Sequence, residues 1–504
     1  MMISKTDADL PPAFNRDNLS ASTLLLLLLG AYIALVPSID LIPVLGRYDE
    51  KRLLECILLL LAGFCLIIQA KLRQNWILLT QQLSSHTRLL MAGVLTLGLL
   101  SAAQATAPDR AILDISLYVL LFIGCLLIAL QRQLQPQFFD ALLLKALLFS
   151  SAFSLLAFFS AFIAAQIEPV PLLHWDLFVN FSHIRFFSQF QSWTLPLIVL
   201  PLLLSRTTPK GLQLWLPLLL ASGWWFLLFS SGTRGTMLGL IIATIVTALT
   251  FGRHALPWFK WQGLALLTGL ALYILLFLLP PLLSAADTSA IQNGTIGRAL
   301  SNSSGRFHLW QVALSMITEH PWLGVGPMHY ACGVTNGIGA HPHNSLLQIA
   351  AEWGLPVALI VVIIALRGAL AWIRLGRVRL RQTDGCGTIH PLLFPALLAS
   401  LITGSTHALF SGVIIMPLSQ ITMILVFGWM LGIYFSTAPM TPKHGITAKN
   451  QLLWLLLPLL ASTGLLAGIA PDLLHFGELL NTTHVPAEAT HYMPRFWQQG
   501  LICG

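Results

Sequence analysis

The sequence predicts an all-α polytopic membrane protein, and two observations carry this prediction. First, 56% of the 504 residues are hydrophobic and only 9% are charged, with a mean hydropathy of +0.79, far outside the range of soluble domains. Second, apolar runs of about 18 residues or more, each long enough to cross roughly 30 Å of hydrocarbon as a helix, recur from residue 21 to residue 470.

These runs predict about twelve or thirteen transmembrane helices. The sixth run is short and contains Pro196 and Pro201, so its limits are the least well defined. The chain then divides into an N-terminal segment (1–20), about nine helices (21–283), a large helical loop (284–344), about four helices (345–470) and a tail (471–504). The runs lie near 21–37, 53–70, 88–104, 111–130, 141–167, 191–204, 212–230, 235–251, 261–283, 345–366, 390–408, 413–435 and 451–470.

The distribution of Lys and Arg predicts which side each loop faces, because these residues accumulate in cytoplasmic loops. With the N-terminus inside, alternate loops hold most of them, so the loop 284–344 and the tail 471–504 face the periplasm. The first helix is expected to be retained, since no small-residue cleavage site follows it. The formal net charge of +8 is then explained by Lys and Arg in cytoplasmic loops, which lie against anionic lipid headgroups. It does not require a nucleic-acid partner.

The cysteines leave one question open. Three of the six lie in predicted spans, whereas Cys332 lies in the large outer loop and Cys503 in the outer tail. An oxidising periplasm could join these two, or both could be free thiols. Phe496 and Trp497 are positioned to dock the tail.

Polar residues on the outer side gather in four groups. The first, residues 180–193, offers Arg185 and Gln189 among aromatics, and is either an interfacial turn in the headgroup belt or a polar wall of a site. The second, residues 230–240, sets Arg234 in a Ser/Gly/Thr turn between two spans. An arginine so close to hydrocarbon is expensive unless an anion or carbonyls receive it, so an anion site is preferred over snorkelling.

The third group places Arg306 in the first turn of a predicted helix that Pro321 ends. A cation there opposes the helix macrodipole, which is reasonable if a phosphate binds both the helix N-terminus and the guanidinium. Trp310, four residues on, could stack on Arg306 or on a sugar. The alternative is a surface helix with an incidental arginine.

The fourth group is AHPHNSLLQIAAEWG, residues 340–354. It sets His341, His343 and Asn344 at the edge of an apolar helix that is predicted to span the membrane. A histidine there can take a proton from a hydroxyl at neutral pH, beside a substrate whose lipid tail stays in the bilayer. Glu352, the only formal charge in this predicted span, is expected to be buried and paired.

Several patterns are absent from the sequence. The outer loops contain no DxD, DD or ExD pattern on which metal-dependent sugar transferases hold a cation, and no acidic residue follows the HxH pair at a ligand-like spacing. We therefore expect no metal and no cofactor, with arginines supplying the positive charge. Neither a Walker A motif nor a CxxC frame occurs, which disfavours ATP-driven transport and redox chemistry.

The motifs SSGTRGTMLGL, GRFHLWQVALSMITEHPWLGVGP and HPHNSLLQIAAEWGLP, in this order, resemble the superfamily of O-antigen ligases, O-antigen polymerases and protein O-oligosaccharyltransferases of bacterial inner membranes. The resemblance covers residues 180–436 well and the first five helices only by hydropathy. It implies a GT-C-like ligase fold, a metal-independent inverting glycosyltransferase, and an undecaprenyl-diphosphate-linked glycan as donor. It places the essential histidine on His343 and the phosphate-binding arginines on Arg234 and Arg306.

Within this resemblance, Arg185 is a further candidate for the diphosphate clamp, and His341 and Asn344 for orienting the base or the sugar. Three acceptors stay open. Transfer of O-antigen to lipid A-core in lipopolysaccharide biosynthesis is preferred, followed by serine glycosylation of pilin or other exported proteins, and then by extension of the glycan itself. A glycolipid transporter is least favoured, because the ionisable groups gather outside the predicted spans.

Overall fold

The computed structural model describes residues 19–167, 177–204, 210–279, 305–333, 339–381, 389–437, 448–474 and 494–498. Within these ranges the secondary structure is helical and includes no strand, which confirms the predicted fold class. Most of the predicted tail and the first part of the predicted large loop lie outside the described residues.

The helices follow one another along the chain without a repeated unit. The first set is α1 (Leu19–Leu35), α2 (Asp49–Ile68), α3 (Ala70–Gln82), α4 (Ser85–Ala103), α5 (Pro108–Leu134) and α6 (Pro136–Ile167). The second set is α7 (Ile184–Thr194), α8 (Leu200–Leu203), α9 (Leu212–Ser231), α10 (Arg234–Phe251) and α11 (Leu256–Tyr273). The third set is α14 (Arg306–Glu319), α15 (Ser345–Trp353), α16 (Leu355–Arg381), α17 (Leu393–Ala408), α18 (Pro417–Phe435) and α19 (Ala448–Leu474). Short turns are η2 (Pro43–Leu45), η3 (Leu195–Leu197), η4 (Gly252–Ala255) and η6 (His329–Gly333), and η5 (Ile274–Leu278) is a π-helix.

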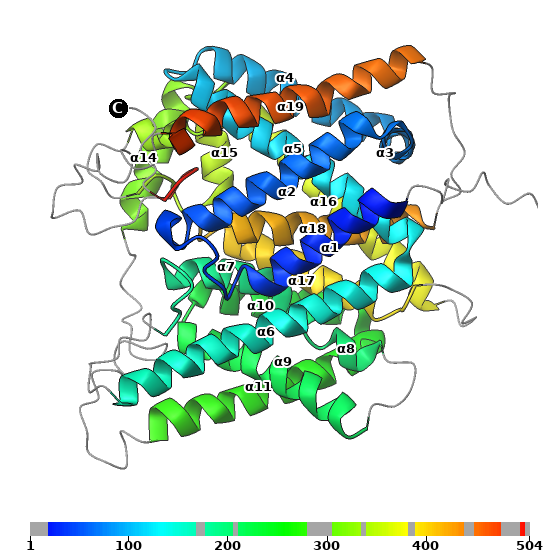
Figure 1. Cartoon of the computed structure of the whole chain (residues 1–504), viewed down its shortest axis with the longest axis vertical. Helices are drawn as coiled ribbons and strands as arrows, with labels where there is room; N and C mark the ends of the chain where they lie inside the picture. Colours follow the sequence, from blue (N-terminus) through cyan, green and yellow to red (C-terminus); the bar gives the residue numbers. More distant parts are fainter. Residues whose placement is uncertain are drawn as a thin grey trace, which may run out of the picture.

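Helices α5 and α18 lie at the centre of the bundle and pack against each other (Figure 1). Both are buried along most of their length, as expected for helices that are apolar on every face. Glycines make the approach close, because a side chain added at Gly428 would lie 2.6 Å from the carbonyl oxygen of Cys125. Small residues at helix contacts are typical of membrane proteins, where lipid is as apolar as the helices and close packing must hold them together.

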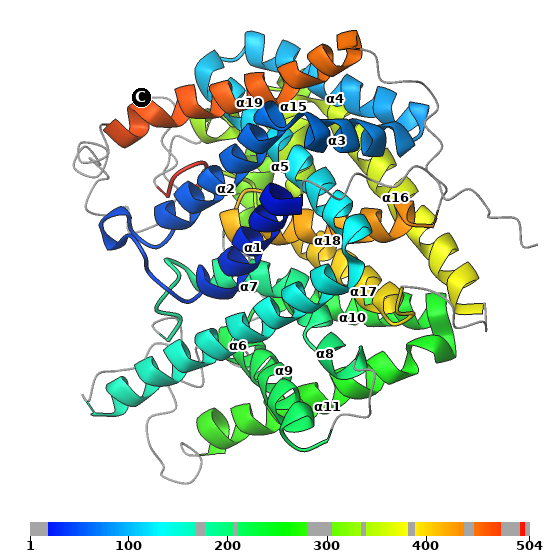
Figure 2. The same cartoon turned by 45° about the vertical axis from the view of Figure 1, so that its right-hand side comes forward.

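Nine helical stretches of the described ranges are long and apolar enough to cross a membrane, so the protein is a multi-pass membrane protein. The pair α2 and α3, bent by 103°, adds one more if it is a single span, and α1 and α17 are apolar but shorter. One of the nine joins α10 and α11 through η4, where Gly252 has a φ of 52° and from which the two helices diverge (Figure 2). The sequence prediction of twelve or thirteen spans is higher because it counted α1, α2 and α17 as spans and counted α10 and α11 as two spans.

The tenth predicted span, residues 345–366, was placed wrongly at its start. Helix α15 ends at Trp353, Gly354 has a φ of 87°, and α16 begins at Leu355. An added Cβ at Gly354 would lie 2.3 Å from the carbonyl oxygen of Trp322, so only glycine fits this corner. The candidate span is Leu355–Arg381, and the predicted histidines precede a separate helix of nine residues.

Helices α14 and α15 and the start of α16 lie together at one end of the bundle, which we call the α14 end (Figure 1). The backbone N–H of Leu355 donates to the carbonyl oxygen of Pro321 over 2.9 Å and holds this corner together. Helix α16 has 27 residues and is about 40 Å long, so its arginine-rich end lies at the opposite end of the bundle (Figure 2). This separation agrees with the predicted orientation, which itself stays a prediction.

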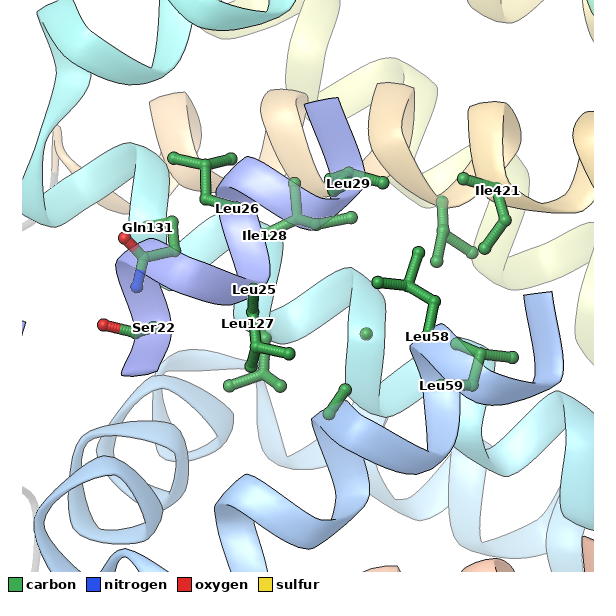
Figure 3. Close-up of a pocket in the computed structure, with 13 residues that line it drawn as sticks. Ser22, Leu25, Leu26, Leu29, Leu58, Leu59, Leu127, Ile128, Gln131 and Ile421 are labelled. Carbon is green, nitrogen blue, oxygen red and sulfur yellow. The ribbon is translucent and has the colours of Figure 1, made fainter. Parts of the chain in front are cut away.

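A cavity between α1, α2, α5 and α18 is lined almost entirely by apolar side chains (Figure 3). None of the predicted site residues lines it. The lining residues are Ser22, Leu25, Leu26, Leu29, Leu58, Leu59, Ala62, Gly124, Leu127, Ile128, Gln131, Ile421 and Ile424.

Candidate functional site

The segment 340–344, which we call the histidine loop, leads into α15 at the α14 end. His343 has a φ of 52°, in the left-handed region that residues other than glycine rarely adopt. Such a conformation costs of the order of 1–3 kcal/mol, persists only where surrounding contacts fix it, and is common at functional sites. The contacts of the histidine loop therefore matter for what His343 does.

Two neighbouring side chains hold the histidine loop. Trp310 on α14 donates its indole N–H to the carbonyl oxygen of Pro342 over 3.0 Å. The sequence had suggested that Trp310 stacks on Arg306 or on a sugar, and this contact was not predicted. Asn344 is the N-cap of α15, and its side-chain oxygen accepts hydrogen bonds from two backbone N–H groups of the first turn at 3.0 and 3.1 Å.

Trp310→Phe keeps an aromatic ring but removes the N–H donor. We expect this variant to slow the glycan transfer that the sequence resemblance implies about two- to tenfold, because one lost hydrogen bond costs roughly 0.5–1.5 kcal/mol. Initial transfer rates of the purified protein in liposomes measure this effect. Trp322→Phe is the matched control, because Trp322 is 74% exposed. Equal rates for the two variants would exclude this role of Trp310.

His341 packs against His343, with the ring centroids 4.2 Å apart and the ring planes at 72°. It is buried, and its Nδ1–H donates to the carbonyl oxygen of Pro494 over 3.2 Å. A carbonyl only accepts, so the proton is on Nδ1. Burial, together with the positive charge of Arg495, lowers the pKa of His341 to about 3, which keeps the ring neutral at pH 7.

His343 is also neutral at pH 7. Burial lowers its pKa well below the usual 6.5, and the neighbouring His341, Arg185 and Arg306 lower it further. Its Nδ1 atom is buried and has no hydrogen-bond partner in the part of the chain that the structure describes. A neutral imidazole with an unoccupied ring nitrogen is able to accept a proton.

This pKa shift predicts a pH dependence. The kcat/KM of transfer should fall on the acid side with an apparent pKa below 6.5, since this ratio reports groups of the free enzyme. The diphosphate donor that the sequence resemblance implies would favour the protonated imidazole when bound, so the acid limb of kcat should lie at higher pH than that of kcat/KM. Steady-state rates from pH 4 to 8 test both statements, and an acid limb of kcat/KM above 6.5 contradicts the first.

Three helices begin beside the histidine loop with an arginine in their first turn. Arg185 is the second residue of α7, Arg234 the first of α10 and Arg306 the first of α14. The N-terminus of a helix carries the positive end of its dipole and binds anions. Burial and the charge of Arg234 lower the pKa of Arg306, and Arg185 and Arg306 both act on His343. The structure thus brings Arg185 and Arg306 to the histidine loop, and Arg234 close to Arg306.

Gln189 lies one turn after Arg185, on the same face of α7. It is 1% exposed, and its amide donates to the Ser411 hydroxyl over 2.7 Å. Its Oε1 is buried and has no partner among the described residues. The side chain therefore lies in the protein interior beneath Arg185.

His407 was not predicted from the sequence. Its Nδ1 lies 2.7 Å from the Ser192 hydroxyl and 3.3 Å from that of Thr236. Helix α10 packs closely here, since a Cβ added at Gly235 would lie 2.5 Å from the His407 ring. The only signal was an ionisable residue inside an apolar run, which by itself marks a candidate functional residue.

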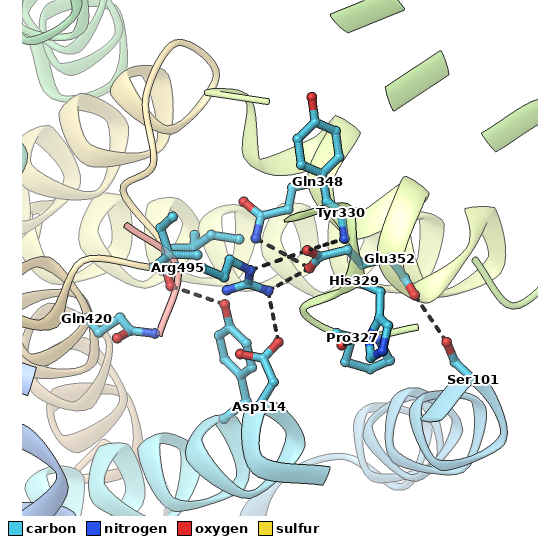
Figure 4. Close-up of polar contacts among 12 residues, drawn as sticks. Ser101, Asp114, Pro327, His329, Tyr330, Gln348, Glu352, Gln420 and Arg495 are labelled. Atoms are coloured by element: carbon cyan, nitrogen blue, oxygen red, sulfur yellow. Dashed lines mark hydrogen bonds and ion pairs between the residues drawn. The ribbon is translucent and has the colours of Figure 1, made fainter. Parts of the chain in front are cut away.

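Arg495 of the tail forms a buried ion triad with Asp114 on α5 and Glu352 on α15 (Figure 4). Its Nη2 lies 3.1 Å from Asp114 Oδ2 and 2.7 Å from Glu352 Oε2, and no member of the triad is more than 2% exposed. The prediction that Glu352 is buried and paired is confirmed, and so is the docking of the tail by Phe496 and Trp497, which are buried.

Cys332 is disulfide-bonded, and the three cysteines predicted in spans are free. Its predicted partner Cys503 lies outside the described residues, so this pairing stays a prediction. Two contacts bring the tail close to Cys332. The Tyr330 backbone N–H donates to Glu352 Oε1 over 3.3 Å, and Arg495 binds the same carboxylate.

Residues 217–362 match the family model described as O-antigen ligase. The matched stretch contains Arg234, Arg306 and the histidine loop, and it excludes Arg185 and Arg495. No curated protein matches the chain. The matched stretch, less than a third of the chain, and the multi-pass helical fold support a relationship to the O-antigen ligase superfamily and a glycosyl-transfer function in the membrane.

Proposed function

We propose that the protein transfers a glycan from undecaprenyl diphosphate to an acceptor hydroxyl at the periplasmic face of the bacterial inner membrane. One observation carries the proposal: a neutral histidine with an unoccupied Nδ1 lies beside three helix N-termini that each carry an arginine. The histidine provides a base and the helix N-termini provide a site for a diphosphate.

Arg234 and Arg306, with Arg185, bind the donor diphosphate and stabilise the charge that develops on the leaving group. The Nε of Arg306 is buried and has no partner in the described ranges, so it has a hydrogen bond to offer. Guanidinium groups thereby supply the positive charge that a divalent cation supplies in metal-dependent transferases, and the proposed reaction is metal-independent. Helices α7 and α10, which carry Arg185 and Arg234, continue into apolar spans, which allows the lipid tail to stay in the bilayer.

His343 acts as the general base. As the acceptor oxygen forms its bond to the anomeric carbon, the hydroxyl proton moves to Nδ1 of His343. The bond between the anomeric carbon and the phosphate oxygen breaks, and undecaprenyl diphosphate leaves with the electron pair. The leaving group is a stable anion, so no general acid is required. Attack from the face opposite the diphosphate inverts the anomeric configuration.

Lipid A-core is the acceptor that we propose first. Protein O-oligosaccharyltransferases and O-antigen polymerases would use the same donor site and the same base, and they differ only in the hydroxyl that attacks. Gene deletion separates the three, because each acceptor leaves a different product.

We expect deletion to abolish smooth lipopolysaccharide while glycoprotein staining of the same cells is unchanged. Complementation with the wild-type gene should restore the banding, and complementation with His343→Ala should not. Loss of glycoprotein staining with intact lipopolysaccharide would instead assign protein transfer. Lipopolysaccharide that carries a single repeat unit would assign polymerisation, and no change in either readout contradicts the proposal.

A further inference from the structure

A short segment of the tail, Pro494–Gln498, lies inside the bundle at the α14 end, far in sequence from everything it contacts (Figure 1). The Tyr48 hydroxyl donates to the carbonyl oxygen of Arg495 over 3.3 Å, and Arg52 Nε donates to that of Phe496 over 3.0 Å. The indole N–H of Trp497 donates to Asp472 Oδ2 over 2.8 Å. The segment is therefore held by α2 and α19 through its backbone and side chains.

Arg495 neutralises two carboxylates that are otherwise buried with like charge. Its Nε and Nη2 both bind Glu352, at 3.3 and 2.7 Å, and Nη2 also binds Asp114 (Figure 4). A guanidinium is suited to this task, because its planar donors reach two acceptors at once and it stays charged when buried. Without it α5 and α15 would present two negative groups to each other.

The same segment holds the histidine loop from both sides. Before His343, the Pro494 carbonyl accepts the Nδ1–H of His341, whose ring lies against His343. After His343, Arg495 holds Glu352 on α15, the helix that starts at Ser345. The left-handed φ of His343 is thus fixed between two points that the tail grips.

We propose that Pro494–Gln498 is part of the active site, and that Arg495 is a positioning residue that holds His341 and α15 so that His343 can accept the proton. This inference rests on the function proposed above. It predicts that loss of Arg495 impairs the chemical step more than donor binding, because the arginine cluster is on α7, α10 and α14 and not on the tail.

The test compares Arg495→Met in a chain that also carries Asp114→Asn and Glu352→Gln, so that no carboxylate is left buried without a partner. We expect this triple variant to insert and to bind the donor, with a KM for the donor within about twofold of wild type and a kcat lower by roughly ten- to a hundredfold, as for a displaced catalytic group.

The matched control is Arg132→Met with Asp140→Asn. These residues form a buried ion pair, 2.7 Å apart, between α5 and α6, near the end of the bundle opposite α14, and should leave kcat and the pH profile unchanged. The inference is overturned if the triple variant has a normal kcat. It is also overturned if the variant loses activity only in proportion to a loss of thermal stability. Arg495→Lys in the otherwise unchanged chain keeps the charge but not the planar donors, and it should retain only part of the wild-type kcat.

His343→Ala in the same assay separates the two proposals. If His343→Ala is inactive and the triple variant is normal, the tail has no positioning role and the proposed function stands. If His343→Ala retains full activity, the proposed function fails, and the positioning role of Arg495 fails with it.

Discussion

Replacing His343 with alanine is expected to lower the rate of glycan transfer by roughly two to four orders of magnitude, the contribution typical of a general base. Donor binding should persist, because the arginines that we propose bind the diphosphate are unchanged. The other imidazole of the histidine loop is less suited to the role of base: His341 uses its Nδ1–H to bind Pro494, and its Nε2, which also has no partner among the described residues, lies against Gly412. Transfer rates and donor binding are measured on the purified protein in liposomes.

His308→Ala is the control for this experiment, since His308 is an exposed histidine on α14. It should transfer at the wild-type rate. Turnover by His343→Ala at more than a tenth of the wild-type rate would remove His343 from the role of base. Loss of donor binding by His343→Ala would show instead that the imidazole helps to hold the diphosphate.

Replacing Arg306 with glutamine should lower kcat/KM by roughly two to three orders of magnitude, as does removal of a preorganised group that stabilises charge in a transition state. Arg306→Lys should recover only part of this loss, because an ammonium cannot offer two parallel donors to a phosphate. The donor-free protein should not lose stability in Arg306→Gln. Burial and Arg234 disfavour the Arg306 charge, so its removal relieves a repulsion.

Arg374→Gln, an exposed arginine near the far end of α16, is the matched control and should leave kcat/KM unchanged. Thermal unfolding of the donor-free variants checks the stability statement. A clear fall in melting temperature for Arg306→Gln would mean that Arg306 has a structural partner, and the fall in activity would then not report on the diphosphate.

The sequence predicted the helices well where hydropathy alone decides, and it failed where backbone geometry decides. The run 345–366 is apolar throughout, but Gly354 divides it, because Trp322 leaves no space for a side chain there. Hydropathy takes no account of φ. The turn at Gly252 was predicted as a gap between two apolar runs, since Arg253 and Lys260 interrupt the hydrophobic pattern.

For the site, residue type and local sequence identified the arginines, but only Arg306 was predicted in the first turn of a helix. That Arg185 and Arg234 also stand in the first turns of their helices is shown by the structure. The partners of Glu352 were beyond reach, since Arg495 is 143 residues away and binds Asp114 381 residues away. A buried carboxylate in an apolar run predicts that a partner exists, but it does not say which. Trp310 was identified as important, but its contact with Pro342 depends on how α14 and the histidine loop pack.

The buried ion triad also sets the order in which the protein can mature. Pro494–Gln498 follow all of the described helices along the chain, so Arg495 is synthesised after α5 and α15. Until then Asp114 and Glu352 lack the guanidinium that bridges them, and burying a carboxylate without its partner is costly. Docking of Pro494–Gln498 is therefore expected to be a late step of folding, after the helices that it joins have been made.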